Sequence, residues 1–185
     1  MYQTAIDTKS VIAISDTHGR HRELHIPGTD IIIYAGDACT DGDMDQLADF
    51  FDWYAGLPVA HKIFVPGNHD LPFELEPDEC TAMIPANVTW LNNNVIKIAS
   101  IRIGALPPHF HWIDSFAHAG EPVDMLVTYA PPYGILDRDT GCKELRKYVM
   151  AAKPRFHFFG HIHEEAGKIR RIGGSSFINT CVFND

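Results

Sequence analysis

The sequence predicts an α/β protein: a four-layer sandwich in which two mixed β-sheets pack face to face and helices flank them. Five short, mostly apolar runs each end at a cluster of Gly, Pro, Asp or His, at residues 11–15, 30–34, 62–65, 124–129 and 155–159. Such runs are typical of buried strands whose carboxyl ends lead into loops. Helical periodicity lies between two pairs of these runs, and shorter β-type segments occupy much of the remaining chain.

Two helices are predicted between strands. In residues 43–55, Met44, Leu47 and Phe51 recur at helical spacing behind an Asp-rich start, so this segment is expected to be the crossover helix of a βαβ unit. Residues 142–152 form the second predicted helix, which Lys153 and Pro154 terminate.

The remaining β-type segments are short and are interrupted by Asn, Gly and Ser. They lie at residues 88–91, 95–99, 101–105, 167–172 and 176–178, and we expect antiparallel hairpins from them. A chain of 185 residues, 45% of them hydrophobic, is the right size for one buried core, so residues 1–185 are expected to form a single domain.

Composition excludes several classes of function. A net charge of −9 disfavours binding to long nucleic acids or to anionic membranes, although a small anion could still bind through local metal charge. No segment approaches the roughly 20 apolar residues of a membrane span, and residues 1–10 lack a signal-peptide pattern, so a cytoplasmic location is expected. The four cysteines are dispersed, which favours buried free thiols: Cys39, Cys80, Cys142 and Cys181.

Four short motifs follow the predicted strands and share Asp, His, Asn and Gly. They are Asp16-Thr17-His18-Gly19, Gly36-Asp37, Gly67-Asn68-His69-Asp70 and Gly160-His161-Ile162-His163. Ligands of α/β sheets gather outside the carboxyl ends of the strands, so these motifs are expected to meet at one edge. Together they offer six oxygen or nitrogen ligands, enough for two divalent ions about 3.5–4 Å apart.

Each motif has an expected role. Asp16 and His18 alternate along a segment predicted to be extended, so both can reach one ion. A carboxylate can bridge two cations, and we assign that role to Asp37, while Asn68 offers an amide oxygen to the second ion. His161 and His163 supply imidazoles, which suit Mn, Fe, Zn or Ni better than Mg or Ca.

The motifs resemble those of the calcineurin-like metallophosphoesterases over residues 15–163, in the order Asp-x-His, Gly-Asp, Gly-Asn-His-(Asp/Glu) and Gly-His-x-His. Gly141-Cys142-Lys143-Glu144-Leu145 and Phe177-Ile178-Asn179-Thr180 further resemble the small phosphodiesterase-like branch called the MPPED type. The resemblance implies the sandwich fold and a dinuclear site. One ion would be held by Asp16, His18, Asp37 and His163, and the other by Asp37, Asn68 and His161.

The chain departs from the family pattern at Tyr129, which stands where the family has a histidine. A phenol with a pKa near 10 is a poor ligand unless a metal removes its proton, so the second site is expected to be weaker. Tyr129 could bind as a phenolate, lie nearby unbound, or leave its place to water. His109 and His111 could also reach over the site and replace the missing ligand.

The expected reaction is hydrolysis, in which the metal ions activate a water and polarise a phosphoryl oxygen. His69 is predicted to be the general acid, oriented by Asp70, or alternatively to stabilise charge in the transition state. Arg20 could contact a substrate phosphate or remain in a solvated loop. Asp41, Asp43 and Asp45 lie at a helix start and are interpreted as capping and solvated charges.

The sequence therefore predicts a metal-dependent phosphoesterase, most simply a phosphodiesterase acting on a small diester such as a cyclic nucleotide, with Mn as the expected metal and Fe, Zn, Ni or Mg as alternatives. A phosphomonoesterase is the second hypothesis, and Arg20 and Arg22 are its local candidates for gripping a dianion. The third is a catalytically weakened protein that binds a metal or nucleotide, suggested by Tyr129. Nothing in the sequence bears on the oligomeric state.

Overall fold

The first half of the chain builds a five-stranded sheet with strand order β1-β2-β3-β4-β5. The computed structural model describes residues 1–106 and 122–184. The strands are β1 (Tyr2–Ile6), β2 (Lys9–Ile14), β3 (Ile31–Ala35), β4 (His61–Val65) and β5 (Val88–Trp90). β1 pairs with β2 in an antiparallel hairpin, and all other pairs in this sheet are parallel. The carboxyl ends of β2, β3 and β4 therefore lie along the same edge.

The second sheet has six strands in the order β10-β11-β9-β8-β7-β6. They are β6 (Val95–Ile98), β7 (Ile101–Ala105), β8 (Met125–Val127), β9 (Phe156–Phe159), β10 (Ile169–Ile172) and β11 (Ser175–Asn179). The outer pairs are antiparallel, and the inner pairs β7–β8, β8–β9 and β9–β11 are parallel. Both sheets are mixed, as predicted.

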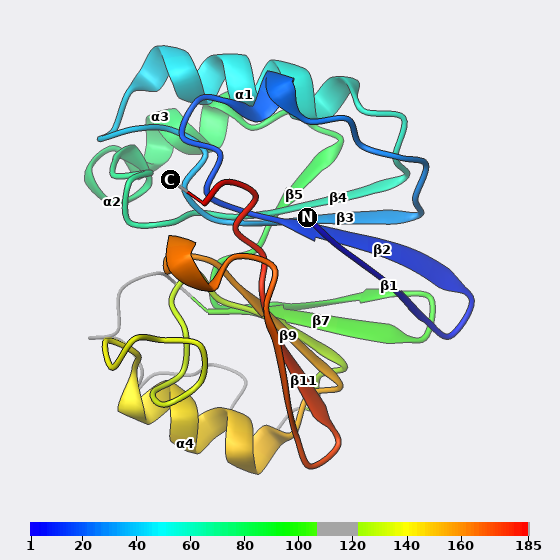
Figure 1. The fold of residues 1–185 in the computed structure, drawn as a ribbon. Coiled ribbons are helices and arrows are strands. Elements are labelled where there is room, and N and C mark those ends of the chain that lie inside the picture. Colours follow the sequence, from blue (N-terminus) through cyan, green and yellow to red (C-terminus); the bar gives the residue numbers. More distant parts are fainter. Residues whose placement is uncertain (107–121, 185) are drawn as a thin grey trace.

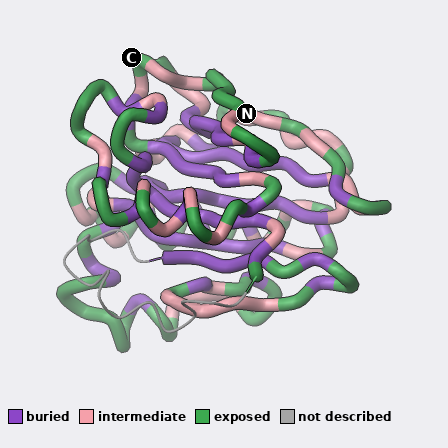
Figure 2. The backbone as a smooth tube through the Cα atoms, turned by 90° about the horizontal axis from the view of Figure 1, so that it is seen from below, coloured by how far each residue is buried: buried purple, intermediate pink, exposed green. Residues whose placement is uncertain are grey.

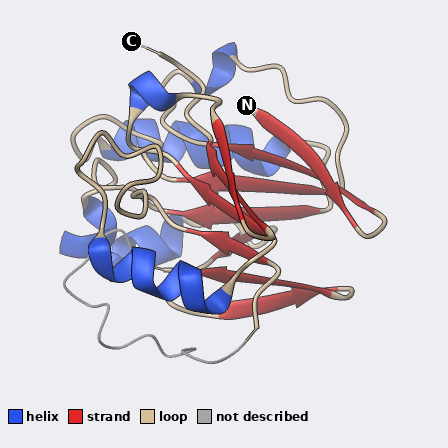
Figure 3. Ribbon diagram, turned by 60° about the horizontal axis from the view of Figure 1, so that its bottom comes forward, coloured by secondary structure: helices blue, strands red, loops and turns tan. Residues whose placement is uncertain are grey.

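Helices cover the outer faces of the two sheets (Figure 1). α1 (Met44–Gly56), α2 (Pro72–Leu75) and α3 (Pro77–Met83) accompany the five-stranded sheet, and α4 (Lys143–Ala152) covers the six-stranded sheet. The described residues also include two short 3-10 helices, η1 (His21–Glu23) and η3 (His163–Glu165). Figure 3 shows the resulting order of layers, with the strands of both sheets between the helices. This is the predicted four-layer α/β sandwich.

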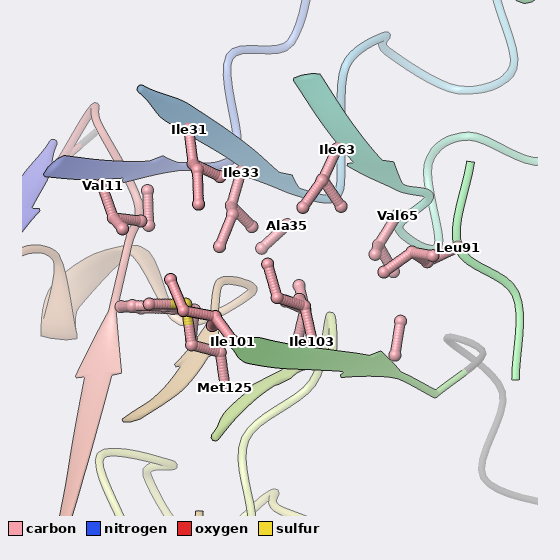
Figure 4. Close-up of a cluster of buried hydrophobic side chains, with 14 of the residues drawn as sticks. Val11, Ile31, Ile33, Ala35, Ile63, Val65, Leu91, Ile101, Ile103 and Met125 are labelled. Atoms are coloured by element: carbon pink, nitrogen blue, oxygen red, sulfur yellow. The ribbon is translucent and has the colours of Figure 1, made fainter. Parts of the chain in front are cut away.

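The central core lies between the sheets and is aliphatic. Ile33, Ile63, Ile103 and Met125 are fully buried there and face one another across the interface (Figure 4). A second, aromatic cluster under α1 joins Phe50 and other rings of the helix to the outer face of the five-stranded sheet. A third cluster lies under α4. The strands consequently form the most buried part of the backbone (Figure 2).

Both predicted helices form close to their predicted bounds. Asp43 is the N-cap of α1 and accepts a hydrogen bond from the backbone N–H of Gln46, which confirms its capping role. The N-cap of α4 is Cys142, whose sulfur accepts from the N–H of Leu145. Within the described part of the chain, no helix is long and apolar enough to cross a bilayer.

Three features of the fold differ from expectation. β1 adds a hairpin strand that the polar, half-exposed segment did not predict, and α2 and α3 occupy a Pro- and Glu-rich stretch left without an element. β5 was expected to belong to the antiparallel hairpins, but it pairs in parallel with β4. Its partner is set by tertiary contacts, because three residues carry too little periodicity to specify one.

Candidate metal centre

The four sequence motifs leave the carboxyl ends of β2, β3, β4 and β9 and converge at one end of the sandwich. Nε2 of His163 lies 3.4 Å from Oδ1 of Asp16, and Nε2 of His18 lies 3.7 Å from Oδ2 of Asp37. Ligand atoms of Asp16, His18 and His163 all lie within 4.8 Å of one another. Asp16 and His163, which lie near opposite ends of the chain, therefore meet as predicted.

The Nε2 atoms of His18 and His163 face the same space. Nδ1 of His18 lies 3.3 Å from the carbonyl oxygen of Cys39, so this nitrogen carries the ring proton and Nε2 is left as an acceptor. That Nε2 lies 3.3 Å from Nε2 of His163 and faces the Asp37 carboxylate. Burial lowers the pKa of His18, which favours the neutral imidazole. This concentration of acceptors is suited to a cation.

The ligand-bearing loops have an unusual backbone, which corrects one detail of the prediction. Asp16 and His18 were expected to alternate along an extended segment, but their φ angles are +58° and +44°. Asp37 and His161 also have positive φ, at +59° and +72°. Left-handed backbone at non-glycine residues costs on the order of 1–3 kcal/mol each and persists only where surrounding contacts enforce it. Hydrogen bonds from the first loop to the Gly36 and Asp37 carbonyls supply that constraint.

Two glycines are required by close approach to the carboxylates. A Cβ on Gly67 would collide with Oδ1 of Asp37, and one on Gly160 would collide with Oδ2 of Asp16. The glycines in the Gly-Asn-His-Asp and Gly-His-x-His motifs therefore make room for the ligand of a neighbouring loop.

Asp70 is a structural anchor, which differs from its predicted role. It is buried, and its two oxygens accept hydrogen bonds from the backbone N–H groups of Asp37, Ala38, Cys39 and Gly67 at 2.9–3.1 Å. These bonds tie the loop after β3 to the loop after β4. With both oxygens used in this way, Asp70 is not the carboxylate that orients the His69 ring.

Asp41 takes that position. Its Oδ1 lies 2.8 Å from Nδ1 of His69, while the backbone N–H of His69 donates to Oδ1 of Asp37 at 2.9 Å. The His69 ring makes an edge contact with the His18 ring, with centroids 5.1 Å apart. His69 is thus at the rim of the site, with Nδ1 held by Asp41. The sequence alone indicates a capping or solvated charge for Asp41, and no local pattern distinguishes it from Asp43 and Asp45.

The carboxylates of the site are buried together. Burial, with the charges of Asp70 and Asp16, raises the pKa of Asp37 to about 9. Asp16 behaves differently: although burial raises its pKa, hydrogen bonds from His163, Cys181 and Ser15 hold that pKa below the usual value. The thiol of Cys181 donates to Oδ2 of Asp16 at 3.0 Å. Carboxylates packed this closely favour the binding of a cation.

Tyr129 lies at the centre of the site. Its side chain is buried, and its hydroxyl contacts Oδ2 of Asp37, Oδ1 of Asp16 at 3.2 Å and Nδ1 of His161 at 3.1 Å. Burial and the two carboxylates raise the pKa of Tyr129 well above the usual value, so the metal-free site contains a neutral phenol. The phenol joins residues assigned to both ions.

The site fits divalent metal. Oδ1 of Asn68 is buried and accepts no hydrogen bond, although a buried amide oxygen normally has a partner. Asn68 follows β4, in the loop where the N–H of the next residue, His69, donates to Oδ1 of Asp37. A metal ion would supply the missing partner of this oxygen. Asp16, His18 and His163, with Asp37 beside them, offer the mixed oxygen and nitrogen set that transition metals prefer.

The other predicted contacts have different outcomes. Arg20 makes an ion pair with Glu23 at 3.1 Å, and its guanidinium lies 3.8 Å from the centre of the Phe183 ring. The structure therefore records a role for Arg20 in its own loop. His109 and His111 lie outside the described residues. All four cysteines are free and buried, as predicted.

Comparisons with known proteins agree with this arrangement. The sequence matches the family description "Calcineurin-like phosphoesterase" over residues 9–165. It is 29% identical over 213 residues to human Metallophosphoesterase domain-containing protein 1, covering 92% of this chain and 65% of the relative. A UPF0046 protein of Caenorhabditis elegans is 28% identical over 203 residues, covering 94% and 70%. The chain thus spans about two thirds of the human relative's length.

Solved structures share the fold at low sequence identity. Phosphopantetheinyl hydrolase from Mycobacterium tuberculosis superposes with a TM-score of 0.68 at 15% identity, covering 94% of this chain and 89% of that one. The protein TT1561 of Thermus thermophilus gives a TM-score of 0.66 at 15% identity, covering 92% and 88%. Because the family match covers most of the chain and the motif residues converge in the matching fold, this chain belongs to the calcineurin-like phosphoesterases, metal-dependent hydrolases of phosphoric esters.

Proposed function

We propose that this chain is a phosphodiesterase that hydrolyses a small, singly charged diester, such as a cyclic nucleotide, at a centre for two divalent ions. Asp16, His18, Asp37 and His163 would hold one ion, and Asp37, Asn68 and His161 the other. The observation that carries the proposal is the unpartnered, buried Asn68 oxygen, since it adds a second metal position beside the Asp16–His18–His163 cluster. Mn²⁺ is the proposed metal because three imidazoles contribute.

The bound ions would supply charge for a phosphoryl oxygen and a water of lowered pKa. The protein's contribution is to fix this geometry. Asp70 ties two ligand loops together through backbone N–H groups, and the carbonyl of Cys39 fixes the tautomer of His18. These contacts hold the ligands before substrate binds, so little reorganisation is needed during the reaction.

His69 is proposed to deliver the proton that the leaving alkoxide needs. Its Nδ1 is held by Asp41, so Nε2 is available toward the substrate. Replacing it by His69→Ala is expected to lower kcat by about 10²–10⁴-fold, the usual contribution of a general acid, while metal content is retained. Turnover of bis(p-nitrophenyl) phosphate, with bound metal measured in parallel, checks this expectation.

The role of Asp41 is tested by a matched pair of variants in the same acidic segment. Asp41→Asn is expected to lower kcat by about tenfold, less than removal of His69 itself, because Asp41 is largely exposed and acts only through the His69 ring. Asp45→Asn removes an exposed charge four residues away and is expected to leave kcat unchanged. Equal kcat in the two variants would contradict the proposed His69–Asp41 pair.

Charge favours a diester over a monoester. A monoester phosphate carries about two negative charges and is usually held by cationic side chains. Among the described residues, Arg20 and Arg22 follow the first ligand motif and Arg155 precedes the histidine motif, and each is paired: Arg20 with Glu23, Arg22 with Asp49 and Asp52, and Arg155 with Asp7. A singly charged diester needs less compensation and fits the site better.

The experiment compares bis(p-nitrophenyl) phosphate with p-nitrophenyl phosphate, using metal-stripped protein with and without Mn²⁺. We expect Mn²⁺-dependent cleavage of the diester and a kcat/KM for the monoester that is at least about tenfold lower. A tenfold difference in kcat/KM corresponds to about 1.4 kcal/mol in transition-state binding. A preference for the monoester would establish the phosphomonoesterase instead. Stoichiometric metal with no turnover of either substrate would favour a metal- or nucleotide-binding protein, the alternative that the Tyr129 contacts with both carboxylates suggest.

A further inference from the structure

Asn179 ends β11 beside the strand that leads into the histidine motif. β11 pairs in parallel with β9, and Asn179 is in register with Phe159, the residue before Gly160. The side chain of Asn179 is completely buried. Its backbone N–H donates to the carbonyl of Lys168, and its own carbonyl accepts from the N–H of Gly167. Both backbone polar groups of Asn179 are therefore bonded to the segment that leads into β10.

The Asn179 amide holds the loop that carries His161 and His163. Its Nδ2 donates to the carbonyl of Ile162 at 2.8 Å and lies 3.4 Å from the carbonyl of Gly160. These two carbonyls flank His161, whose φ of +72° is strained. An amide nitrogen carries two protons and can satisfy both carbonyls, which an ionised carboxylate cannot do. The orientation of these peptides determines where the two imidazoles point.

The next two residues extend this contact to the other sheet. The N–H of Thr180 donates to the carbonyl of Phe159 at 2.7 Å, and the carbonyl of Thr180 accepts from the N–H of Ser15 at 3.1 Å. The thiol of Cys181 then reaches Oδ2 of Asp16 at 3.0 Å, while the N–H of Cys181 donates to Oδ1 of Asn179. In Figure 1 this segment passes from the end of β11 toward the five-stranded sheet.

We propose that Asn179 and Cys181 are positioning residues of the metal centre. Asn179 fixes the orientation of the His161 and His163 imidazoles through its hydrogen bonds to the Gly160 and Ile162 carbonyls. Cys181 fixes the orientation of the Asp16 carboxylate by donating to its Oδ2. The segment 179–181 thereby fixes ligands of one sheet against a ligand of the other. This inference rests on the proposed metal centre and adds a role for residues that lie outside its ligand motifs.

The main test is Asn179→Asp, which preserves size and the acceptor for the Cys181 N–H but removes both donors. Mn²⁺ affinity is measured by calorimetry on metal-stripped protein, and the absorption spectrum of bound Co²⁺ reports ligand geometry. Residues that support metal ligands typically contribute about 10- to 100-fold to affinity, so a weakening of that size with an altered Co²⁺ spectrum is expected. Wild-type affinity together with a wild-type spectrum would overturn the role of Asn179.

Tyr54→Phe is the matched control for a general loss of stability. The Tyr54 hydroxyl is buried and donates to the carbonyls of Ile32 and Ile63, within the aromatic layer under α1. Its removal is expected to lower Tm while leaving the Kd for Mn²⁺ and the Co²⁺ spectrum unchanged. If Tyr54→Phe weakened Mn²⁺ as much as Asn179→Asp, the effect would be general destabilisation and the proposal would fail.

Cys181 provides a second, independent test in case Asn179→Asp does not fold. Cys181→Ala removes the donor to Asp16 and is expected to weaken Mn²⁺ binding, whereas Cys181→Ser retains a donor and should recover much of the affinity. Equal affinity in the alanine, serine and wild-type proteins would overturn the role of Cys181. A wild-type protein that binds no Mn²⁺ or Co²⁺ would instead refute the metal centre itself, so the two failures are distinguishable.

Discussion

Asp37→Asn is expected to abolish metal-dependent hydrolysis. Asp37 is the proposed bridging ligand: its Oδ2 contacts the Tyr129 hydroxyl and lies 3.7 Å from Nε2 of His18, while Oδ1 accepts the N–H of His69. The substitution preserves the shape of the side chain, but an amide cannot ionise and offers only one oxygen. It therefore could not bind both ions as an ionised carboxylate would. Diester turnover should fall by at least about 10³-fold, more than about 4 kcal/mol in activation free energy. Bound metal should fall below two ions per chain.

The heat stability of the metal-free protein distinguishes this loss of turnover from unfolding of the variant. Because its surroundings raise the pKa of Asp37 to about 9, the metal-free protein already keeps this group neutral at pH 7. Removing its capacity to ionise should therefore leave the metal-free Asp37→Asn protein at least as heat-stable as wild type. Asp52→Asn, which removes an exposed partner of Arg22, serves as the surface control and should retain full activity. Unchanged turnover in Asp37→Asn would eliminate the dinuclear mechanism.

The sequence predicted the convergence of the ligand loops for a physical reason. β2, β3 and β4 are parallel, as is β9 with its neighbours, and each is a mostly apolar run with the ligand residues within a few positions of its carboxyl end. In parallel sheets, such residues are brought to one edge by topology alone. Asp16, Asp37 and His163 could therefore be placed together without knowledge of side-chain geometry.

The contacts that support the ligands could not be predicted in this way. Asp70 follows His69 directly in the chain, yet its carboxylate turns to backbone N–H groups in the loop after β3, while the exposed Asp41 reaches the His69 ring. Both outcomes depend on how two loops pack, which local patterns do not encode. The same holds for Asn179, whose partners lie 17 and 19 positions earlier. The left-handed backbone at Asp16 and His161 also arises from tertiary constraint, since neither residue type requires it.

Tyr129→His tests why the second metal position is expected to be weak. In the metal-free protein the neutral phenol contacts the lone pairs of Asp37 and Asp16 that would otherwise face a cation. Coordination by Tyr129 would first require loss of a proton whose pKa is raised by burial and by both carboxylates. An imidazole offers a lone pair without that cost. We expect the second Mn²⁺ to bind about tenfold more tightly, a gain of about 1.4 kcal/mol, or turnover to rise comparably.

Tyr129→Phe distinguishes the two ways in which the phenol could act. The Tyr129 ring packs closely on Gly36, and phenylalanine retains that contact while removing only the hydroxyl. If the phenol is a neutral hydrogen-bond donor that competes with the cation, Tyr129→Phe should preserve or tighten Mn²⁺ binding. If Tyr129 instead coordinates as a phenolate, Tyr129→Phe should weaken Mn²⁺ and Tyr129→His should restore it. Calorimetric titration of both variants decides the question, and identical Mn²⁺ affinity and turnover in wild type, histidine and phenylalanine forms would show that position 129 does not limit the site.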